Sequence, residues 1–266
     1  MTWTTQPRSE GAGDLAYFKA GKGPALVLIH GVGLRAEAWG AIIPLLSDYF
    51  TIYAVDMPGH GQSPLGDVSA LSHYANRVLD MVDTVSGPIF IAGHSMGAVI
   101  ALDVAHQRVD RIAGIAAINA IYRRSKTASA AVKARAAEIA AKGSLNPGAT
   151  LDRWFGEDPQ GPLHAASEAC EKWLTGADPK GYATAYGLFA SQDGPNDAVL
   201  TALPMPALFI TADGDLNSTP KMSQAMARLA PKGRAISVPE AAHMLPMTHP
   251  EHLAKAILDT FEGTVI

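Results

Sequence analysis

Short apolar runs recur along the chain, and helical patterns separate them. The runs that read as strands cover residues 15–19, 25–29, 51–55, 88–92, 112–118, 206–211 and 235–238. The clearest helix lies over 71–85, where Leu71, Tyr74 and Val78 share one face, and a shorter helix is expected over 39–46. Continuously apolar strands that alternate with helices are typical of a parallel sheet covered on both faces. The pattern therefore predicts an α/β fold with a mostly parallel sheet.

This alternation stops after Asn119. Residues 121–200 carry helical patterns but no run that reads as a buried strand, and turn-rich stretches such as 156–162 interrupt them. Several aromatic residues gather in the segment, namely Trp154, Phe155, Trp173, Tyr182, Tyr186 and Phe189. We therefore predict a core formed by residues 1–120 and 201–266, with a helical cap of residues 121–200 inserted between two core strands.

Composition and charge narrow the class of protein. The 266 residues are 48% hydrophobic and 17% charged, and the net charge of −4 gives no electrostatic reason to expect nucleic acid or an anionic membrane as a partner. The single cysteine, Cys170, cannot form an intramolecular disulfide. No signal-like N-terminal segment is visible, and no apolar run approaches the ~18 residues of a membrane helix. We expect a cytoplasmic protein.

The motif Gly93-His94-Ser95-Met96-Gly97 carries the clearest chemical signal. It follows the apolar run 88–92 and precedes a helix-favouring segment, which is the setting of a nucleophile elbow. The flanking glycines would let strand and helix approach closely, and the helix N-terminus would face an anion forming at the serine. The motif predicts Ser95 as a catalytic nucleophile.

A serine nucleophile needs a general base and an acid that orients the base. Asp213 and Asp215 follow the predicted strand 206–211, and His243 follows the last predicted strand, 235–238. The chain order is thus serine, aspartate and histidine, each in a loop just after a strand. We predict His243 as the general base that takes the serine proton.

Together these motifs resemble the α/β-hydrolase superfamily over nearly the whole chain. The resemblance is carried by Leu28-Ile29-His30-Gly31, Asp56-Met57-Pro58-Gly59-His60-Gly61-Gln62-Ser63, Gly93-His94-Ser95-Met96-Gly97, Asp215 and His243. The order of the three catalytic residues matches that family as well. The resemblance implies the α/β-hydrolase fold, with a cap that lies over the active site.

The resemblance also chooses between the two candidate acids. The family places a small residue at the strand end and the acid three positions later, which from Ala212 gives Asp215. Asp213 is the alternative and would otherwise be a turn residue. Some relatives carry the acid after the strand before the cap, but that position here is Asn119. Asp215 is therefore the predicted acid.

The family further implies an oxyanion hole of two main-chain N–H groups. One belongs to Met96, the residue after the nucleophile, and the other to Val32, with Gly33 as the alternative. Cap residues that could contact substrate are the aromatics Trp154, Phe155, Trp173 and Tyr186. Arg123 and Arg124, which open the cap, could bind a substrate carboxylate, although a solvated basic pair is the simpler interpretation.

The predicted activity is that of a serine hydrolase that needs no cofactor. Neither H-E-x-x-H nor C-x-x-C spacing is present, and no G-x-G-x-x-G follows a strand, so neither a metal nor a dinucleotide is expected. The expected substrate is a small carboxylic ester. The alternatives are a C–C bond hydrolase, a lactonase or a perhydrolase with the same triad, and, in another class, a ligand-binding receptor on the hydrolase fold.

Overall fold

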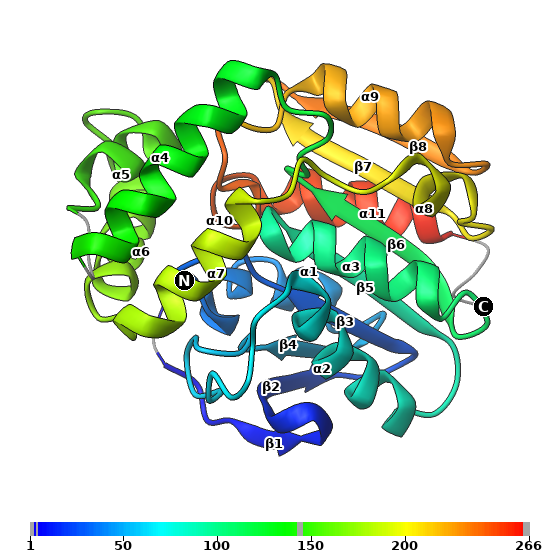
Figure 1. Cartoon of the computed structure of the whole chain (residues 1–266). Helices are drawn as coiled ribbons and strands as arrows, with labels where there is room; N and C mark the ends of the chain where they lie inside the picture. The colour runs from blue at the N-terminus through cyan, green and yellow to red at the C-terminus, as the bar shows by residue number, and fades with distance from the viewer. Residues whose placement is uncertain (1–2, 4, 143–145, 263–266) are drawn as a thin grey trace.

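The computed structural model describes residues 3, 5–142 and 146–262. Within these residues the chain forms one eight-stranded sheet with the strand order β1-β2-β4-β3-β5-β6-β7-β8 (Figure 1). The strands are β1 (Ser9–Gly11), β2 (Leu15–Gly21), β3 (Ala25–Ile29), β4 (Thr51–Val55), β5 (Ile89–His94), β6 (Ile112–Ile118), β7 (Ala207–Ala212) and β8 (Gly233–Val238). The pairs β1–β2 and β2–β4 are antiparallel, and every other pair of neighbouring strands is parallel. The predicted α/β fold is confirmed, whereas β1 was not expected from the sequence.

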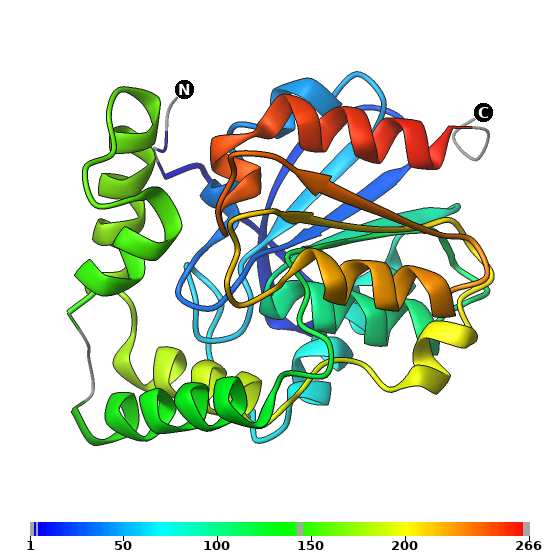
Figure 2. The ribbon, with the colours of Figure 1, turned by 90° about the horizontal axis from the view of Figure 1, so that it is seen from above.

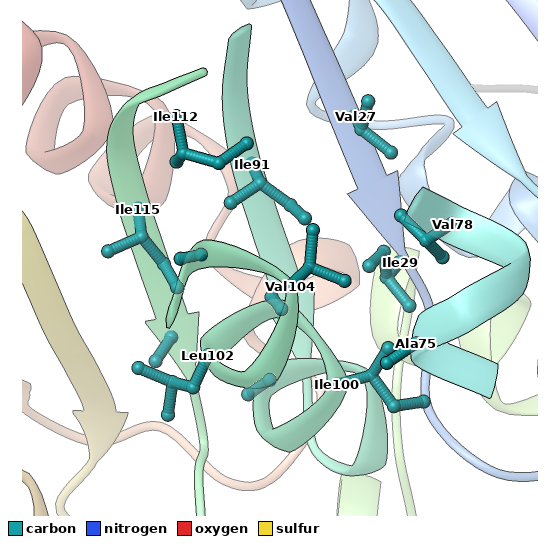
Figure 3. Packing of buried hydrophobic residues seen from close by; sticks show 14 of the residues in the cluster. Val27, Ile29, Ala75, Val78, Ile91, Ile100, Leu102, Val104, Ile112 and Ile115 are labelled. Atoms are coloured by element: carbon teal, nitrogen blue, oxygen red, sulfur yellow. The ribbon is translucent and has the colours of Figure 1, made fainter. Parts of the chain in front are cut away.

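Helices cover both faces of the sheet, as Figure 2 shows. On one face lie α2 (Leu71–Thr84), α3 (Met96–Gln107) and α9 (Pro220–Leu229), and on the other lie α1 (Ile43–Leu46) and α11 (Pro250–Phe261). A hydrophobic cluster lies on each face of the sheet, the first beneath α2, α3 and α9 and the second beneath α1 and α11. The side chains of β3 alternate between them: Val27 and Ile29 belong to the first cluster, and Leu26 and Leu28 belong to the second. Figure 3 shows the first cluster, where isoleucine and valine from β3, β5 and β6 meet α2 and α3. This packing fixes the strand ends that carry the site.

The helix predicted over 39–46 is instead two short pieces. A 3-10 helix, η2, covers Ala36–Trp39, and α1 begins only at Ile43. Pro44 lies in the first turn of α1, where its missing N–H costs nothing, but the same residue would interrupt a continuous helix. The apolar spacing of this segment therefore marks burial without a regular helix.

Between β6 and β7 the chain forms α4 (Lys126–Lys142), α5 (Gly148–Phe155), α6 (Pro162–Thr175), α7 (Pro179–Ala190) and α8 (Asp197–Thr201). The described part of this segment contains no strand. Helices α4 and α7 pack together, as do α5 and α6, and this group of four lies at one end of the sheet (Figures 1 and 2). Helix α8 instead packs against α3 and α9. None of the described helices is long and apolar enough to cross a lipid bilayer.

Candidate active site

Ser95 occupies the sharp turn between β5 and α3. Its backbone is at φ 57° and ψ −116°, a conformation that costs a non-glycine residue energy and needs support from its surroundings. A Cβ on Gly93 would lie 2.0 Å from the Gly97 carbonyl oxygen, and one on Gly97 would lie 2.2 Å from that of Ile29. Both glycines are therefore required by the closeness of strand and helix, and the strained turn places Ser95, which is largely buried, at the carboxyl edge of the sheet.

His243 and Asp215 meet at the same edge. The Nδ1 atom of His243 lies 2.7 Å from Oδ2 of Asp215, and both side chains are almost fully buried. Asp213 is exposed on the surface. The structure thus brings Asp215, and not the alternative Asp213, to the histidine.

The Asp215 carboxylate accepts hydrogen bonds on both oxygens. Oδ2 also accepts from Nδ2 of Asn119 at 2.7 Å, while Oδ1 accepts from the main-chain N–H groups of Asn217 at 2.8 Å and Ser218 at 3.1 Å. Burial alone would raise the pKa of Asp215, but His243 and these donors lower it to about 2. The carboxylate is therefore ionised at neutral pH, and its Oδ2 can hold the Nδ1–H of His243. Asn119 stands where some relatives carry the acid and here supports it.

His94, inside the elbow motif, fixes the main chain of the histidine loop. Its Nε2 lies 2.8 Å from the carbonyl oxygen of His243, so Nε2 carries the hydrogen and donates. Burial lowers the pKa of His94 to about 3, which keeps the ring neutral. A neutral ring committed to this bond positions His243 and leaves proton transfer to His243 itself.

The predicted oxyanion donor Val32 lies in the loop after β3, and hydrogen bonds join this loop to the loop after β4. The Gly33 N–H donates to Nε2 of His60 at 3.0 Å, so the alternative donor is already engaged. The preceding residue, Val32, lines the cavity in front of Ser95, and Met96 begins α3, where the first N–H groups lack helical partners. The same two loops are joined a second time, because the Met57 N–H donates to Nε2 of His30 at 3.0 Å.

A cavity of about 330 Å³ lies over Ser95 and His243. Among the predicted cap residues, Trp154 and Tyr186 line it, and the Trp154 ring stacks on His243 with the centroids 5.8 Å apart. Phe155 and Trp173 are buried in a separate cluster between the cap and the core. The sequence favoured packing within the cap for most of these aromatic rings, and it could not tell which of them would line the cavity.

The two predicted arginines separate in the structure. Arg124 lines the cavity with its side chain 3% exposed, whereas Arg123 is 67% exposed and pairs with Asp197. Two further arginines of the cap, Arg135 and Arg153, also line the cavity. Sequence analysis missed both, because an arginine in an alanine-rich or amphipathic helix reads as a solvated charge.

Cys170 offers no rival nucleophile. It is buried with Sγ 3.5 Å from Sδ of Met247, and burial raises the pKa of its thiol, which disfavours the thiolate. Within residues 5–142 and 146–262, no group of three His, Cys, Asp or Glu side chains is placed to hold a metal ion.

A serine on a strand-to-helix elbow, with a histidine and an aspartate at the same sheet edge, is the arrangement of an α/β-fold hydrolase. The profile of the alpha/beta hydrolase family matches residues 26–256, and the chain belongs to that family. The protein is therefore an enzyme of the hydrolase class, and its relatives include esterases.

Similar proteins cover almost the whole chain. One is the (E)-2-((N-methylformamido)methylene)succinate hydrolase of Acinetobacter baylyi, 38% identical over 93% of this chain and 94% of the relative. Another is a pimeloyl-[acyl-carrier protein] methyl ester esterase of Stenotrophomonas maltophilia, 29% identical over 89% of this chain and 92% of the relative. Among solved structures, a thermophilic esterase from Thermogutta terrifontis is 25% identical, with a TM-score of 0.81 over 95% of this chain and 94% of that one.

Proposed function

We propose that this protein is a serine hydrolase that cleaves a small carboxylic ester through an acyl-enzyme on Ser95, without a cofactor. The observation that carries the proposal is the 2.7 Å contact between His243 Nδ1 and Asp215 Oδ2 beside the strained elbow serine. His243 and Ser95 line one cavity, so an ester bound there would contact the nucleophile and the base together.

In the first half of the reaction, Ser95 Oγ attacks the ester carbonyl while His243 Nε2 takes the hydroxyl proton. Asp215 fixes the tautomer with hydrogen on Nδ1, so that Nε2 is free to act as base, and it stabilises the imidazolium that forms. The proton then passes from His243 to the leaving alcohol as the C–O bond breaks, leaving the acyl group on Ser95.

The main-chain N–H groups of Val32 and Met96 would bind the oxyanion of each tetrahedral intermediate. One such donor contributes about 2.7–4 kcal/mol to transition-state stabilisation. In the second half, His243 removes a proton from water as the water oxygen attacks the acyl carbon. The bond from that carbon to Ser95 Oγ then breaks, His243 returns the proton to Oγ, and the carboxylic acid is released.

The relatives support ester hydrolysis and also favour a second candidate. The relatives from Stenotrophomonas maltophilia and Thermogutta terrifontis are named as esterases, which supports the proposal. The relative from Acinetobacter baylyi is named for hydrolysis of a substituted succinate, so a hydrolase of such an organic acid is the second candidate. Both candidates use a small-molecule substrate and the same triad.

The test combines turnover with labelling. Purified protein is assayed with p-nitrophenyl esters of increasing acyl length and treated with a fluorophosphonate, followed by mass spectrometry of the modified peptide. We expect multiple turnovers, label on Ser95, and loss of both in Ser95→Ala with an unchanged thermal midpoint. Cys170→Ala is the matched control and should keep activity. Turnover retained in Ser95→Ala would refute the nucleophile, and a single binding event without turnover would favour the receptor alternative.

A further inference from the structure

The cavity over Ser95 is positively charged in a protein whose net charge is −4. Three arginines, Arg124, Arg135 and Arg153, line it, and its lining includes no aspartate or glutamate. All three come from the segment between β6 and β7. Like charges placed around one cavity repel each other, so their convergence calls for a compensating anion.

Arg135 and Arg153 converge on one hydroxyl group. Nη2 of Arg135 donates to Oγ1 of Thr150 at 2.8 Å, and Nη2 of Arg153 approaches the same oxygen at 3.3 Å. Among the described residues, neither guanidinium has a carboxylate oxygen within 4.0 Å. Thr150 is buried, whereas Arg135 is half-buried and Arg153 exposed, so the pair lies where the cavity meets solvent.

Arg124 has a different environment. Its Nη1 donates to the Gln192 carbonyl oxygen at 2.8 Å, its guanidinium lies over the Phe189 ring, and Asp193 is 3.8 Å away. Its charge is therefore partly matched by the protein. All three arginines act on the cavity, because burial raises the pKa of Tyr186 while Arg135, Arg153 and Arg124 oppose that rise. The unmatched charge belongs to Arg135 and Arg153.

We propose that Arg135 and Arg153, held by Thr150, form an anion subsite for a carboxylate of the substrate, so that the enzyme acts on the half-ester or a similar acyl derivative of a small dicarboxylic acid. The inference rests on the proposed hydrolase function and names its substrate class. Two guanidinium groups offer several N–H donors in planar arrays, the geometry that a carboxylate accepts best.

The size of the cavity restricts the substrate further. A volume of about 330 Å³ is near the lower limit for small-molecule sites, so one small ligand would contact both Ser95 and the arginine pair. The carboxylate and the reacting carbonyl would then be separated by a short carbon chain. The apolar side chains of Val132 and Ala131 line the cavity and suit that chain.

The first experiment compares anionic and neutral esters of matched length. The p-nitrophenyl half-esters of succinate and glutarate are assayed beside p-nitrophenyl butyrate and pentanoate. We expect Arg135→Gln and Arg153→Gln each to lower kcat/KM for the half-esters by about 10- to 100-fold, the effect of one hydrogen bond to a charged group. The neutral esters should change by less than about threefold. Arg123→Gln, on the exposed cap surface, is the matched control and should leave both ester classes unchanged.

The second experiment separates binding from chemistry. Calorimetric titration of Ser95→Ala with glutarate and with the neutral glutaramide measures the subsite when no turnover is possible. We expect glutarate to bind Ser95→Ala, to bind more weakly as salt is added, and not to bind Ser95→Ala/Arg153→Gln. That result would support the subsite even if none of the esters were turned over. Equal losses for anionic and neutral esters, or no preference for glutarate over glutaramide, would overturn it. Arg135→Lys keeps the charge without the planar fork, so it should recover part of the binding if electrostatics contribute.

Discussion

Replacement of Asp215 by asparagine is the sharpest test of the catalytic geometry. In the structure Oδ1 accepts two main-chain N–H groups and Oδ2 accepts Asn119 and His243, so all four partners are donors. An asparagine amide has one oxygen, which accepts, and one NH2 group, which donates. In either orientation its NH2 group therefore faces groups that are themselves donors. With its oxygen toward the main chain, the NH2 group faces His243 and favours the tautomer with hydrogen on Nε2. That tautomer cannot accept the Ser95 proton.

We therefore expect Asp215→Asn to lower kcat by about 10⁴-fold, or about 5 kcal/mol of activation free energy. Stability should change as well, since the pKa of Asp215 is about 2 in the fold and ordinarily 3.8. That difference corresponds to about 2 kcal/mol, present above about pH 4 and lost as the pH falls through 2. The variant should therefore be less stable than wild type at neutral pH, and the gap should close in acid.

The assays are kcat with p-nitrophenyl acetate and urea unfolding at a series of pH values. Asp213→Asn is the matched control, because Asp213 is exposed and its removal should leave kcat within about twofold of wild type. A larger loss in Asp213→Asn, or an Asp215→Asn enzyme within tenfold of wild type, would refute the assignment. A stability gap that widens in acid would refute the linkage argument.

Three further substitutions test the elbow and the cap. Gly97→Ala should prevent close packing of α3 on β3, because its Cβ would lie 2.2 Å from the Ile29 carbonyl oxygen; we expect poorly folded protein by circular dichroism, and a native spectrum would contradict this. Trp154→Ala should change how kcat/KM depends on the acyl length of the ester, since the Trp154 ring lines the cavity. Trp173 is buried outside the cavity, so Trp173→Ala should lower the free energy of unfolding in urea by about 3–5 kcal/mol and leave the dependence on acyl length unchanged. The reverse assignment would contradict the structure.

The sequence predicted those parts of the fold that depend on local pattern. Strands β3, β5, β6 and β7 are buried and almost entirely apolar, which is typical of strands in a parallel sheet covered on both faces. The elbow could be predicted for the same reason, because its glycines are required by the local closeness of strand and helix. Asp215 needed more, since local pattern left Asp213 open and the choice came from the spacing of the resembling family; the contact with His243 agrees with that choice.

The cap resisted prediction because its helices carry weak patterns. Helix α4 is rich in alanine, and the buried residues within it are only Ser129 and Ile139, so no apolar stripe shows which face meets the cavity. The orientation of Arg135 on that helix is set by contact with Thr150 of α5, which is a tertiary property. A charge pattern on one helix cannot reveal a partner hydroxyl on another.

The two halves of the site are built in different ways. The catalytic groups lie on core loops joined to one another by hydrogen bonds, such as Gly33 to His60, His94 to the His243 carbonyl and Asn119 to Asp215. These bonds fix the triad and oxyanion loop without any cap residue. The arginines come from the cap and are fixed mainly by contacts within it. Substitution in the cap should therefore change which acid is accepted while the core chemistry persists, and this separation is what the paired anionic and neutral esters measure.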